Sequence, residues 1–434
     1  LSLRRVPELL AAAVGTNKLD AALKATLADP RFGGAANACL MVQAGGVPIY
    51  IHNPTLPLVP ASNLKLLTAT AALDRLPSGD RLVTKVMGDA APRNGTLAGN
   101  LYLVGGGDPQ LRTPDYVANL HFPAQIFDNL ITLAEQVRAA GVTQVTGSVV
   151  GDETRYDTQR YIPTWPARYM TNGEVGPLSA LSVNDGFATS KPGPAAAQPA
   201  QQAAAVFSTL LQARGVTVAG AAQAGRAPPA AVKISEFASA PLPDLVDEIL
   251  RRSDNNGAEL ITKELGRQAN SATPTTAAGV ASIQAALQAD GLPTAGLHMV
   301  DGSGLDRSDR VTCQVILDAL LRSGPDGILG RGLAIAGTSG TLYRRMIGTP
   351  AAGRLRAKSG SLEGVSALSG FVTAAPGPVG ATGAGSATSL TFSLITNSSP
   401  SLAAGDALCD RVGVLLAQFP QAPPVADLGP LPGP

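Results

Sequence analysis

The hydrophobic pattern of this chain changes twice, and that change most limits the folds it can adopt. Residues 6–28 have helical periodicity, and strand patterns at 38–44 and 48–52 flank a Gly45-Gly46 turn. Helix and strand patterns return near the other end, at 242–252, 258–268, 276–289, 314–321, 365–373, 388–396 and 402–417. Because both ends have the same mixed character, we expect one α/β (α+β) domain built from two separated segments.

The middle of the chain differs from both ends, because short β-like runs dominate it. Those runs lie at 81–87, 96–104, 143–151, 216–221 and 231–237, and helical patterns lie at 124–140 and 198–214. We predict a discontinuous domain of residues 1–79 and 239–420, a mostly β inserted domain at 80–238, and a disordered Pro-rich tail at 421–434. Residues 374–387 form a predicted Gly/Ala/Pro-rich loop. With 434 residues, 45% of them hydrophobic, the chain is long enough for more than one core.

Charge and composition exclude several classes of partner. The net charge is +1 and only 4% of the residues are aromatic, so neither a nucleic acid nor an anionic membrane surface is expected to bind. The sequence has no run of 18 apolar residues, and no transmembrane segment is predicted. Because residue 1 is Leu and not Met, the first residues say little about a targeting segment.

The three cysteines, Cys39, Cys313 and Cys409, are far apart in the sequence and form no CxxC metal or redox motif. Two interpretations remain open. Cys39 lies in an early strand and Cys409 in the last helix, so the two form a disulfide if those elements pack together. Alternatively, all three are buried reduced thiols.

A possible nucleophile opens the apolar helical run at 61–76. Ser62 and Lys65 are three residues apart, which places them on one face of the first helical turn. The chain has only three His, so a serine nucleophile here would depend on a lysine base. The alternatives are that Ser62 only caps the helix and that Lys65 is a solvated surface lysine.

Two further motifs follow in the order typical of penicillin-recognising serine enzymes, which carry S-x-x-K, S-D-N and K-T-G. One is Ser253-Asp254-Asn255, between two predicted helices, and the other is Lys358-Ser359-Gly360, just before a predicted strand. Ser359 replaces the usual Thr and keeps the hydroxyl. Each motif alone is weak, since Ser253 and Asn255 can be helix caps and Lys358 an ordinary lysine at the start of a strand. All three in order are strong support for this enzyme class.

With these motifs, the sequence resembles the class C low-molecular-mass penicillin-binding proteins, the D-alanyl-D-alanine carboxypeptidase/endopeptidases of peptidase family S13. The resemblance covers residues 35–400 and includes LVGGGDP at 103–109, GDETRY at 151–156, PLSALSVN at 177–184, DGSGL at 301–305 and GTL at 340–342. It implies a serine β-lactamase/transpeptidase-like domain, an antiparallel sheet flanked by helices, with an insert between the first two motifs. The short stretch between Asp108 and Ala124 implies that the family's third domain is reduced or absent.

For the first step of the reaction, the resemblance implies that Ser62 attacks and Lys65 takes its proton. A free lysine has a pKa of about 10.4, so a base at neutral pH needs a pKa lower by about 2–4 units. Burial and a second cation both lower a lysine pKa. We therefore expect Lys358 to be that cation and Asn255 to accept a hydrogen bond from Lys65.

The resemblance also implies how the substrate is held. Ser253 passes the proton to the departing amine, Lys358 and Ser359 bind the terminal carboxylate, and the backbone N–H groups of Ser62 and Ser361 form an oxyanion hole. The substrate-binding residues it implies are Ser359, Gly360, Ser361, Ser303 and Asp152. For Asp152 an exposed structural carboxylate is an equal alternative. The glycine runs at 105–107 and 302–304 lack phosphate-loop spacing and are expected to be structural turns.

The expected function is that of a serine D-Ala-D-Ala carboxypeptidase, with endopeptidase action also possible, on peptidoglycan stem peptides, with β-lactams acylating Ser62. It needs neither cofactor nor metal, and it implies an exported, periplasmic or cell-wall-associated protein. A β-lactamase or esterase with the same serine, and a non-catalytic cell-envelope scaffold, are the alternatives. The sequence has no G-x-S-x-G elbow and no H-E-x-x-H motif, which disfavours an α/β-hydrolase and a zinc DD-peptidase. The oligomeric state stays open.

Overall fold

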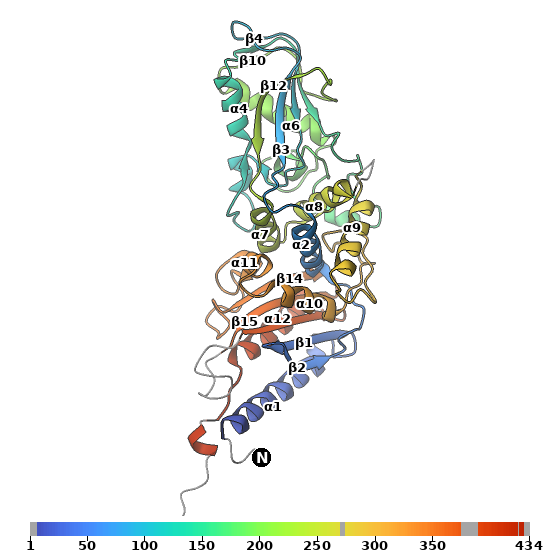
Figure 1. Ribbon diagram of the computed structural model, residues 1–434, viewed down its shortest axis with the longest axis vertical. Coiled ribbons are helices and arrows are strands. Elements are labelled where there is room, and N and C mark those ends of the chain that lie inside the picture. Colours follow the sequence, from blue (N-terminus) through green and yellow to red (C-terminus); the bar gives the residue numbers. More distant parts are fainter. Residues whose placement is uncertain (1–6, 270–273, 375–388, 424, 429–434) are drawn as a thin grey trace, which may run out of the picture. The chain divides into compact units, whose positions relative to one another are not determined.

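The computed structural model describes residues 7–269, 274–374, 389–423 and 425–428. The chain divides into two compact units (Figure 1). Unit 1 consists of residues 1–67, 287–299 and 307–434, and unit 2 consists of residues 68–286 and 300–306. The predicted insert at 80–238 lies entirely within unit 2, which also includes helices on either side of it. The predicted domain boundaries stay a prediction.

Unit 1 contains an antiparallel sheet that joins the two ends of the chain. Its strands follow the order β13 (Ala334–Ile335), β14 (Leu355–Leu362), β15 (Val365–Thr373), β16 (Ser389–Thr396), β1 (Ala38–Ala44) and β2 (Val47–His52). Gly45 and Gly46, with φ of 54° and 82°, form the predicted β1–β2 turn. The N-terminal hairpin therefore pairs with the last strand of the sheet, which brings the two separated segments of the predicted domain together.

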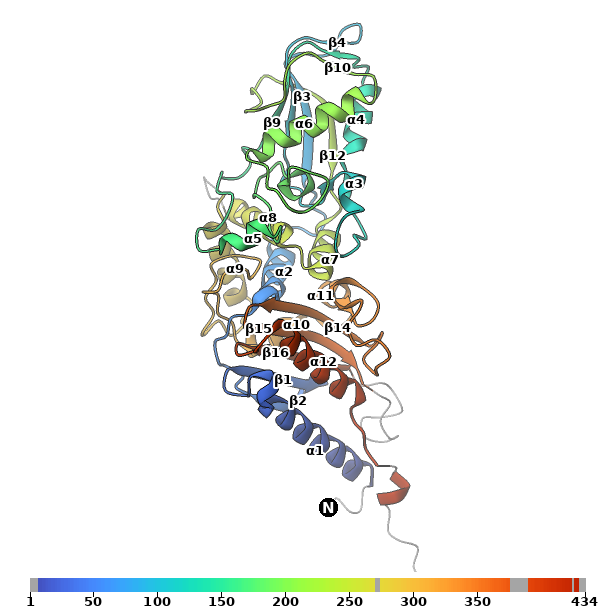
Figure 2. The same ribbon diagram turned by 180° about the vertical axis from the view of Figure 1, so that it is seen from behind.

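Helices cover both faces of this sheet (Figure 2). On one face, α1 (Pro7–Ala28) and α12 (Leu402–Gln418) bury a core that includes Leu23, Leu40, Leu394 and Val412. The other face packs against α10 (Cys313–Ser323) and the short 3-10 turn η3 (Ala61–Asn63), which leads into α2 (Leu64–Arg75). The predicted antiparallel sheet flanked by helices is thus confirmed, and one of its faces carries the first motif.

Unit 2 combines short strands with helices. Its main sheet follows the order β11 (Gln223–Ala224), β9 (Val149–Asp152), β5 (Leu101–Val104), β3 (Val83–Gly88) and β12 (Val232–Ala238). Another sheet runs β10 (Thr217–Val218), β8 (Gln144–Val145) and β4 (Thr96–Leu97), and β6 (Leu111–Arg112) pairs with β7 (Asp128–Asn129). The helices α4 (Leu130–Ala139) and α6 (Pro199–Gln212) bury Leu133 and Phe207 in the same core as Leu101 and Leu103.

The remaining helices connect or extend these layers. In unit 2 they are α3 (Pro114–Val117), α5 (Ala167–Thr171), η4 (Val183–Gly186), α7 (Leu242–Arg252) and α8 (Asn255–Gln268). Helix α9 (Thr276–Ala289) belongs to unit 2 up to residue 286 and to unit 1 from residue 287. In unit 1 they are η2 (Pro30–Phe32), α11 (Ile328–Gly332), η5 (Gly340–Leu342) and η6 (Val425–Leu428). Helices α7 and α8 meet at the second motif. No helix in the described part of the chain is long and apolar enough to span a membrane.

Several predicted elements need correction. The expected strands 96–104 and 143–151 are each split into two, because Gly99 (φ 94°) and Gly147 interrupt them where backbones approach closely. The expected helix 124–140 begins only at Leu130, because Asn129 caps it through a bond from Ile131 N to its side chain (3.0 Å). Of the expected loop and tail, residues 375–388, 424 and 429–434 lie outside the described residues, and Val425–Leu428 forms η6.

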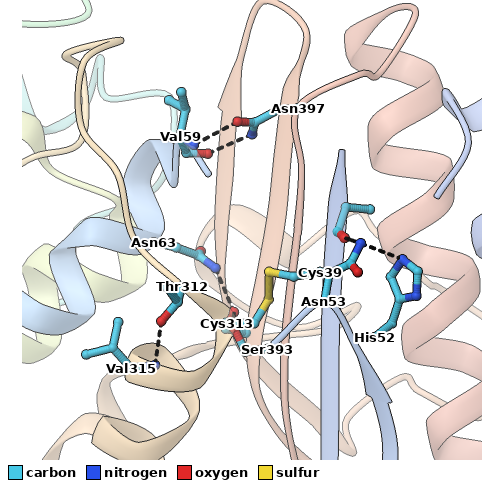
Figure 3. Close-up of a disulfide and its surroundings, with 12 residues drawn as sticks. Cys39, His52, Asn53, Val59, Asn63, Thr312, Cys313, Val315, Ser393 and Asn397 are labelled. Carbon is cyan, nitrogen blue, oxygen red and sulfur yellow. Dashed lines mark hydrogen bonds between the residues drawn. A yellow bond between two sulfur atoms is a disulfide. The ribbon is translucent and has the colours of Figure 1, made fainter. Parts of the chain in front are cut away.

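The cysteine pairing also differs from both expectations. Cys39 forms a disulfide with Cys313, with a Cα–Cα distance of 5.9 Å, and Cys409 is buried and free (Figure 3). The reason is the alternation of side chains along β1. Leu40 packs into the core beneath α12, so Cys39 points to the opposite face, where α10 begins. A Cys39–Cys409 bridge would require Cys39 to face α12, and that expectation is wrong.

Candidate active site

The first motif brings a hydroxyl and an amine into contact. Lys65 Nζ donates a hydrogen bond to Ser62 Oγ over 2.9 Å. The Lys65 side chain is only 1% exposed, so the alternative of a solvated surface lysine is wrong. Ser62 is half-buried and lies within η3, one turn before Lys65 on α2. Ser62 is thus partly exposed, whereas the lysine beside it is enclosed.

The backbone around Ser62 is held in an unusual conformation. Ala61 has φ of 47°, in the left-handed region that alanine rarely adopts. On the other side, β14 approaches η3 so closely that a Cβ on Gly360 would lie 2.9 Å from the carbonyl oxygen of Pro60. The glycine of the third motif is therefore needed for packing against Ser62.

The lysine of the third motif was expected just before a strand, but it lies inside β14. Lys358 is fully buried, and its Nζ donates to the carbonyl oxygen of Ser359 over 2.7 Å. Burial, followed by the positive charge of Lys65, lowers the pKa of Lys358 well below its usual value. The two lysines are therefore close enough for their charges to interact, and the expected effect of Lys358 on the pKa of Lys65 stays a prediction.

The hydroxyl of the third motif is held by Thr341, for which no role was predicted. Ser359 Oγ donates to Thr341 Oγ1 over 2.7 Å, and Thr341 lies in η5. Thr341 belongs to the GTL segment of the family resemblance, which was the available signal. Ser361 follows on the same strand and is exposed. The strand therefore presents two hydroxyls, at 359 and 361, on either side of Gly360.

A chain of buried polar groups lies behind the first motif. Asn63 Nδ2 donates to Ser369 Oγ over 2.7 Å, and Ser369 Oγ donates to Ser393 Oγ over 3.0 Å. Ser369 pairs with Lys358 across β14 and β15, so it faces the same side of the sheet. Asn63 thus links η3 to the sheet by a hydrogen bond. Sequence reasoning did not identify Asn63, since one Asn carries no pattern of its own.

The second motif belongs to unit 2. Ser253 ends α7 with φ of 60°, and Asp254 caps α8 by accepting a hydrogen bond from Gly257 N over 2.9 Å. Of the residues weighed as caps, Ser253 occupies the C-cap of α7 through its backbone N–H, whereas the N-cap of α8 is Asp254 and not Asn255. Asn255 Nδ2 donates to the carbonyl oxygen of Glu174 over 2.7 Å, which orients its side chain. Its contact with Lys65, a residue of unit 1, stays a prediction.

Ser303 lies in a turn that a buried carboxylate holds. Glu259 Oε1 accepts hydrogen bonds from the backbone N–H groups of Gly302 (2.9 Å) and Ser303 (2.8 Å). Burial and the nearby charge of Asp301 raise the pKa of Glu259 to about 8. The glycines of this segment are structural, as expected, because a Cβ on Gly302 would collide with Thr262. A contact of Ser303 with substrate stays a prediction.

Asp152 is buried and not exposed. Its Oδ1 accepts hydrogen bonds from Thr154 N (2.9 Å) and Thr154 Oγ1 (2.7 Å), and its Oδ2 accepts one from Ala227 N (2.8 Å). Of the two alternatives, these bonds favour the structural one, although the carboxylate is enclosed and not on the surface. Binding of substrate by Asp152 stays a prediction.

The structure thus brings together Ser62, Lys65, Lys358, Ser359 and Gly360 within unit 1, and Ser253 with Asn255 within unit 2. The first group contains the parts of an acyl-transfer site: a hydroxyl, an adjacent amine and a second, buried amine. Among the described residues, no cluster of three or more His, Cys, Asp and Glu side chains is arranged to hold a metal ion.

Comparison with known proteins identifies the family. The sequence profile of the D-Ala-D-Ala carboxypeptidase 3 (S13) family matches residues 19–196 and 188–411. The D-alanyl-D-alanine carboxypeptidase of an Actinomadura species is 31% identical over 498 residues, covering 95% of this chain and 87% of that protein. A carboxypeptidase of Mycobacterium tuberculosis is 32% identical over 394 residues, covering 87% of this chain and 79% of that protein.

The fold has a counterpart among solved structures. The crystal structure of penicillin binding protein 4 from Haemophilus influenzae matches with a TM-score of 0.74 at 21% identity, covering 91% of this chain and 99% of that one. At this identity the match shows the fold, while the family rests on the profile and on the sequence relatives. The chain therefore belongs to the D-Ala-D-Ala carboxypeptidase 3 (S13) family of serine-type carboxypeptidases.

Proposed function

We propose that this protein removes the terminal D-alanine from peptidoglycan stem peptides through an acyl-enzyme on Ser62. One observation carries the proposal: a half-buried serine hydroxyl accepts a 2.9 Å hydrogen bond from an enclosed lysine amine. A serine becomes a nucleophile when an adjacent base takes its proton, and in this pair the base and the hydroxyl are already in contact.

In the acylation step, a neutral Lys65 amine takes the proton of the Ser62 hydroxyl while Ser62 Oγ bonds to the carbonyl carbon of the penultimate D-alanine. The carbon–nitrogen bond then breaks, and the proton passes from Lys65 through the Ser253 hydroxyl to the departing amine. In deacylation, water attacks the ester carbon, the bond between that carbon and Ser62 Oγ breaks, and a proton of the water passes to Ser62 Oγ. Each step conserves protons, and no cofactor takes part.

The buried lysine pair supports this proton transfer. Two positive charges enclosed together repel each other. The state in which only one of the two amines, Lys65 or Lys358, is charged is therefore favoured over the state in which both are charged. A carboxylate placed beside Lys358 and Ser359 favours the charged form of Lys358. The substrate would therefore bring the counter-charge that keeps the proton on Lys358 and leaves Lys65 free to act as base.

Charge on the carbonyl oxygen is proposed to be stabilised by the backbone N–H groups of Ser62 and Ser361. The close approach of β14 to η3 supports this, because a Cβ on Gly360 would lie 3.2 Å from the backbone nitrogen of Ser62. One such donor contributes about 3 kcal/mol to transition-state stabilisation. The exposed hydroxyl of Ser361 and the Ser359–Thr341 pair are the proposed contacts for the terminal carboxylate.

β-Lactams are proposed to acylate the same serine. A crystal structure of the Haemophilus influenzae protein named above is described as a complex with a β-lactam, and the fold is shared at a TM-score of 0.65 and 21% identity. We also propose that the protein is exported, to the periplasm or the cell wall. The Cys39–Cys313 disulfide supports this, because disulfides persist mainly in oxidising compartments.

Labelling with a fluorescent penicillin tests the proposal. The native protein is expected to carry a stable covalent label, and Ser62→Ala is expected to carry none. Absence of label on the native protein would contradict the proposal, and a labelled Ser62→Ala protein would move the nucleophile elsewhere. Rapid release of hydrolysed drug would favour a β-lactamase, and no reaction with either drug or D-Ala-D-Ala peptide would favour a non-catalytic scaffold.

A further inference from the structure

Arg112, which lies outside the three motifs, forms an enclosed ionic cluster in unit 2. Its side chain is fully buried on β6. Nη2 donates to Asp254 Oδ2 over 2.8 Å and to Asp185 Oδ1 over 3.0 Å, and Nη1 donates to Gln110 Oε1 over 2.6 Å. One guanidinium therefore joins the middle residue of the second motif to another loop of the same unit.

Asp254 connects this cluster directly to the residues proposed to act in the reaction. Its other oxygen, Oδ1, accepts the 2.9 Å hydrogen bond from Gly257 N that begins α8. On one side is Ser253, with φ of 60° and ψ of 39°, and on the other is Asn255. A non-glycine residue in the left-handed region is disfavoured, so the surroundings must hold it there.

The far side of the cluster is equally fixed. Tyr116 donates its hydroxyl proton to Asp185 Oδ2 over 2.7 Å, and Asn184 Oδ1 accepts a hydrogen bond from Thr113 N over 2.8 Å. Asn256, on the first turn of α8, donates to the carbonyl oxygen of Asp185 over 3.2 Å. The Asp185 loop is thus tied to α8 twice, once through Arg112 and once through Asn256.

The charges are balanced around Arg112. Burial alone would raise the pKa of Asp254, but the charges of Arg112 and Arg252 outweigh it, so the pKa of Asp254 lies below its usual value. For Asp185, burial dominates over Arg112 and the pKa is raised. The two carboxylates share one guanidinium, and Asp254 is the one that stays charged most readily.

We propose that Arg112 is a positioning residue for the second motif: by holding Asp254, it keeps Ser253 and Asn255 in the conformation in which they act. The inference rests on the proposed function of Ser253 as the path of the proton to the leaving amine. A buried ion pair is a poor source of net stability, because desolvation offsets the attraction. Fixing the geometry of one turn is the effect that such a cluster provides.

The proposal predicts a loss that depends on the leaving group. An amine leaves only with a proton, whereas the thiolate released from a thioester needs none, so a misplaced Ser253 hinders peptide hydrolysis more than thioester hydrolysis. For Arg112→Met we expect kcat/KM on the D-Ala-D-Ala peptide to fall about 100-fold, as for a small displacement of an acting group. On a thioester with the same acyl part, we expect a loss of less than about tenfold.

The matched control is Lys263→Met. Lys263 is also buried and lies on the same helix α8, but its ion-pair partner is Asp157, and not Asp254. It is expected to lower thermal stability while changing the peptide-to-thioester ratio by less than about twofold. Asp254→Asn keeps the helix cap and loses the charge, so it is the second variant if Arg112→Met does not fold. Arg112→Lys should restore part of the peptide activity.

Hydrogen exchange tests the positioning without depending on activity. Backbone amides of residues 255–258 are expected to exchange faster in Arg112→Met and Asp254→Asn than in the native protein and Lys263→Met. Unchanged exchange, or equal losses on both substrates, would overturn the proposal. Two other results would show that the proposed function is wrong. One is no penicillin label on the native protein, and the other is a Ser253→Ala protein that loses activity equally on the peptide and the thioester. In either case the hydrogen-exchange result alone would decide the role of Arg112.

Discussion

Gly360 lies against Ser62, and a Cβ on residue 360 would stand 3.2 Å from the backbone nitrogen of Ser62. The third motif therefore contributes more than a lysine and a hydroxyl. Because residue 360 is a glycine and has no side chain, β14 can also approach the turn that carries Ser62. The geometry of the proposed oxyanion donors depends on this approach.

Gly360→Ala is expected to slow acylation by a fluorescent penicillin about 100-fold, because the added methyl group pushes β14 away from Pro60 and Ser62. Overpacking of this kind should cost about 1–3 kcal/mol of unfolding free energy, measured in urea. The control is Gly79→Ala, because an added Cβ there meets nothing within 4 Å. An unchanged acylation rate in Gly360→Ala would show that the close approach is not needed.

Lys358→Met is expected to abolish peptide hydrolysis and to change how stability depends on pH. The lowered pKa of Lys358 means that the unfolded chain binds a proton more readily than the folded one, so folded stability falls as the pH falls below the usual lysine pKa. This slope, up to about 1.4 kcal/mol per pH unit, should be absent from Lys358→Met. Urea unfolding at several pH values measures it, and identical slopes in both proteins would contradict the expectation.

Glu259→Gln is expected to have the opposite effect. Because its folded pKa is about 8, Glu259 binds a proton more readily in the folded protein, and its contribution to stability is lost as the pH rises from about 4 to about 8. The variant should flatten the decline of the melting temperature across that range. Glu135→Gln, at an exposed carboxylate, is the control. A decline that persists unchanged in Glu259→Gln would assign it to other groups.

The three cysteines should differ in reactivity. Burial raises the pKa of the Cys409 thiol to about 12, so an alkylating reagent should leave the folded protein unmodified. In urea without reductant, only Cys409 should be alkylated, because Cys39 and Cys313 are bonded to each other. Peptide mass spectrometry identifies the labelled residue, and label on Cys39 before reduction would disprove the pairing.

Strong periodicity made much of the fold predictable. Helix α7 and strand β1 begin and end at the predicted residues, since α7 has a clear apolar face and β1 is a short apolar run that is buried on both faces. Strands of two residues, such as β4 and β8, are too short to show a period. Strand β14 was missed because Lys358, Ser359 and Gly360 interrupt the apolar pattern in the middle of the strand.

The motifs predicted which residues lie together in the part of the site that belongs to unit 1. They did not predict which other residues fix the positions of the motif residues. Ser62, Lys65 and Lys358 follow a spacing that the sequence displays. Arg112 and Glu259 do not, because each acts on residues far away in the chain and neither belongs to a local pattern. Strand alternation explains the disulfide. Neighbouring residues of β1 face opposite sides of the sheet, so Cys39 faces away from α12, the helix that covers Leu40.

The Cys39–Cys313 bond, which joins residues 274 positions apart, also gives the chain the topology of a lariat. The covalent ring contains Ser62, Ser253 and the whole of unit 2. Lys358 and strand β14 lie outside the ring, in the segment that follows Cys313. A protease that cuts once within the ring therefore leaves both ends of the cut attached to one molecule. Such a nicked protein would run as one chain on a denaturing gel until a reductant opens the ring.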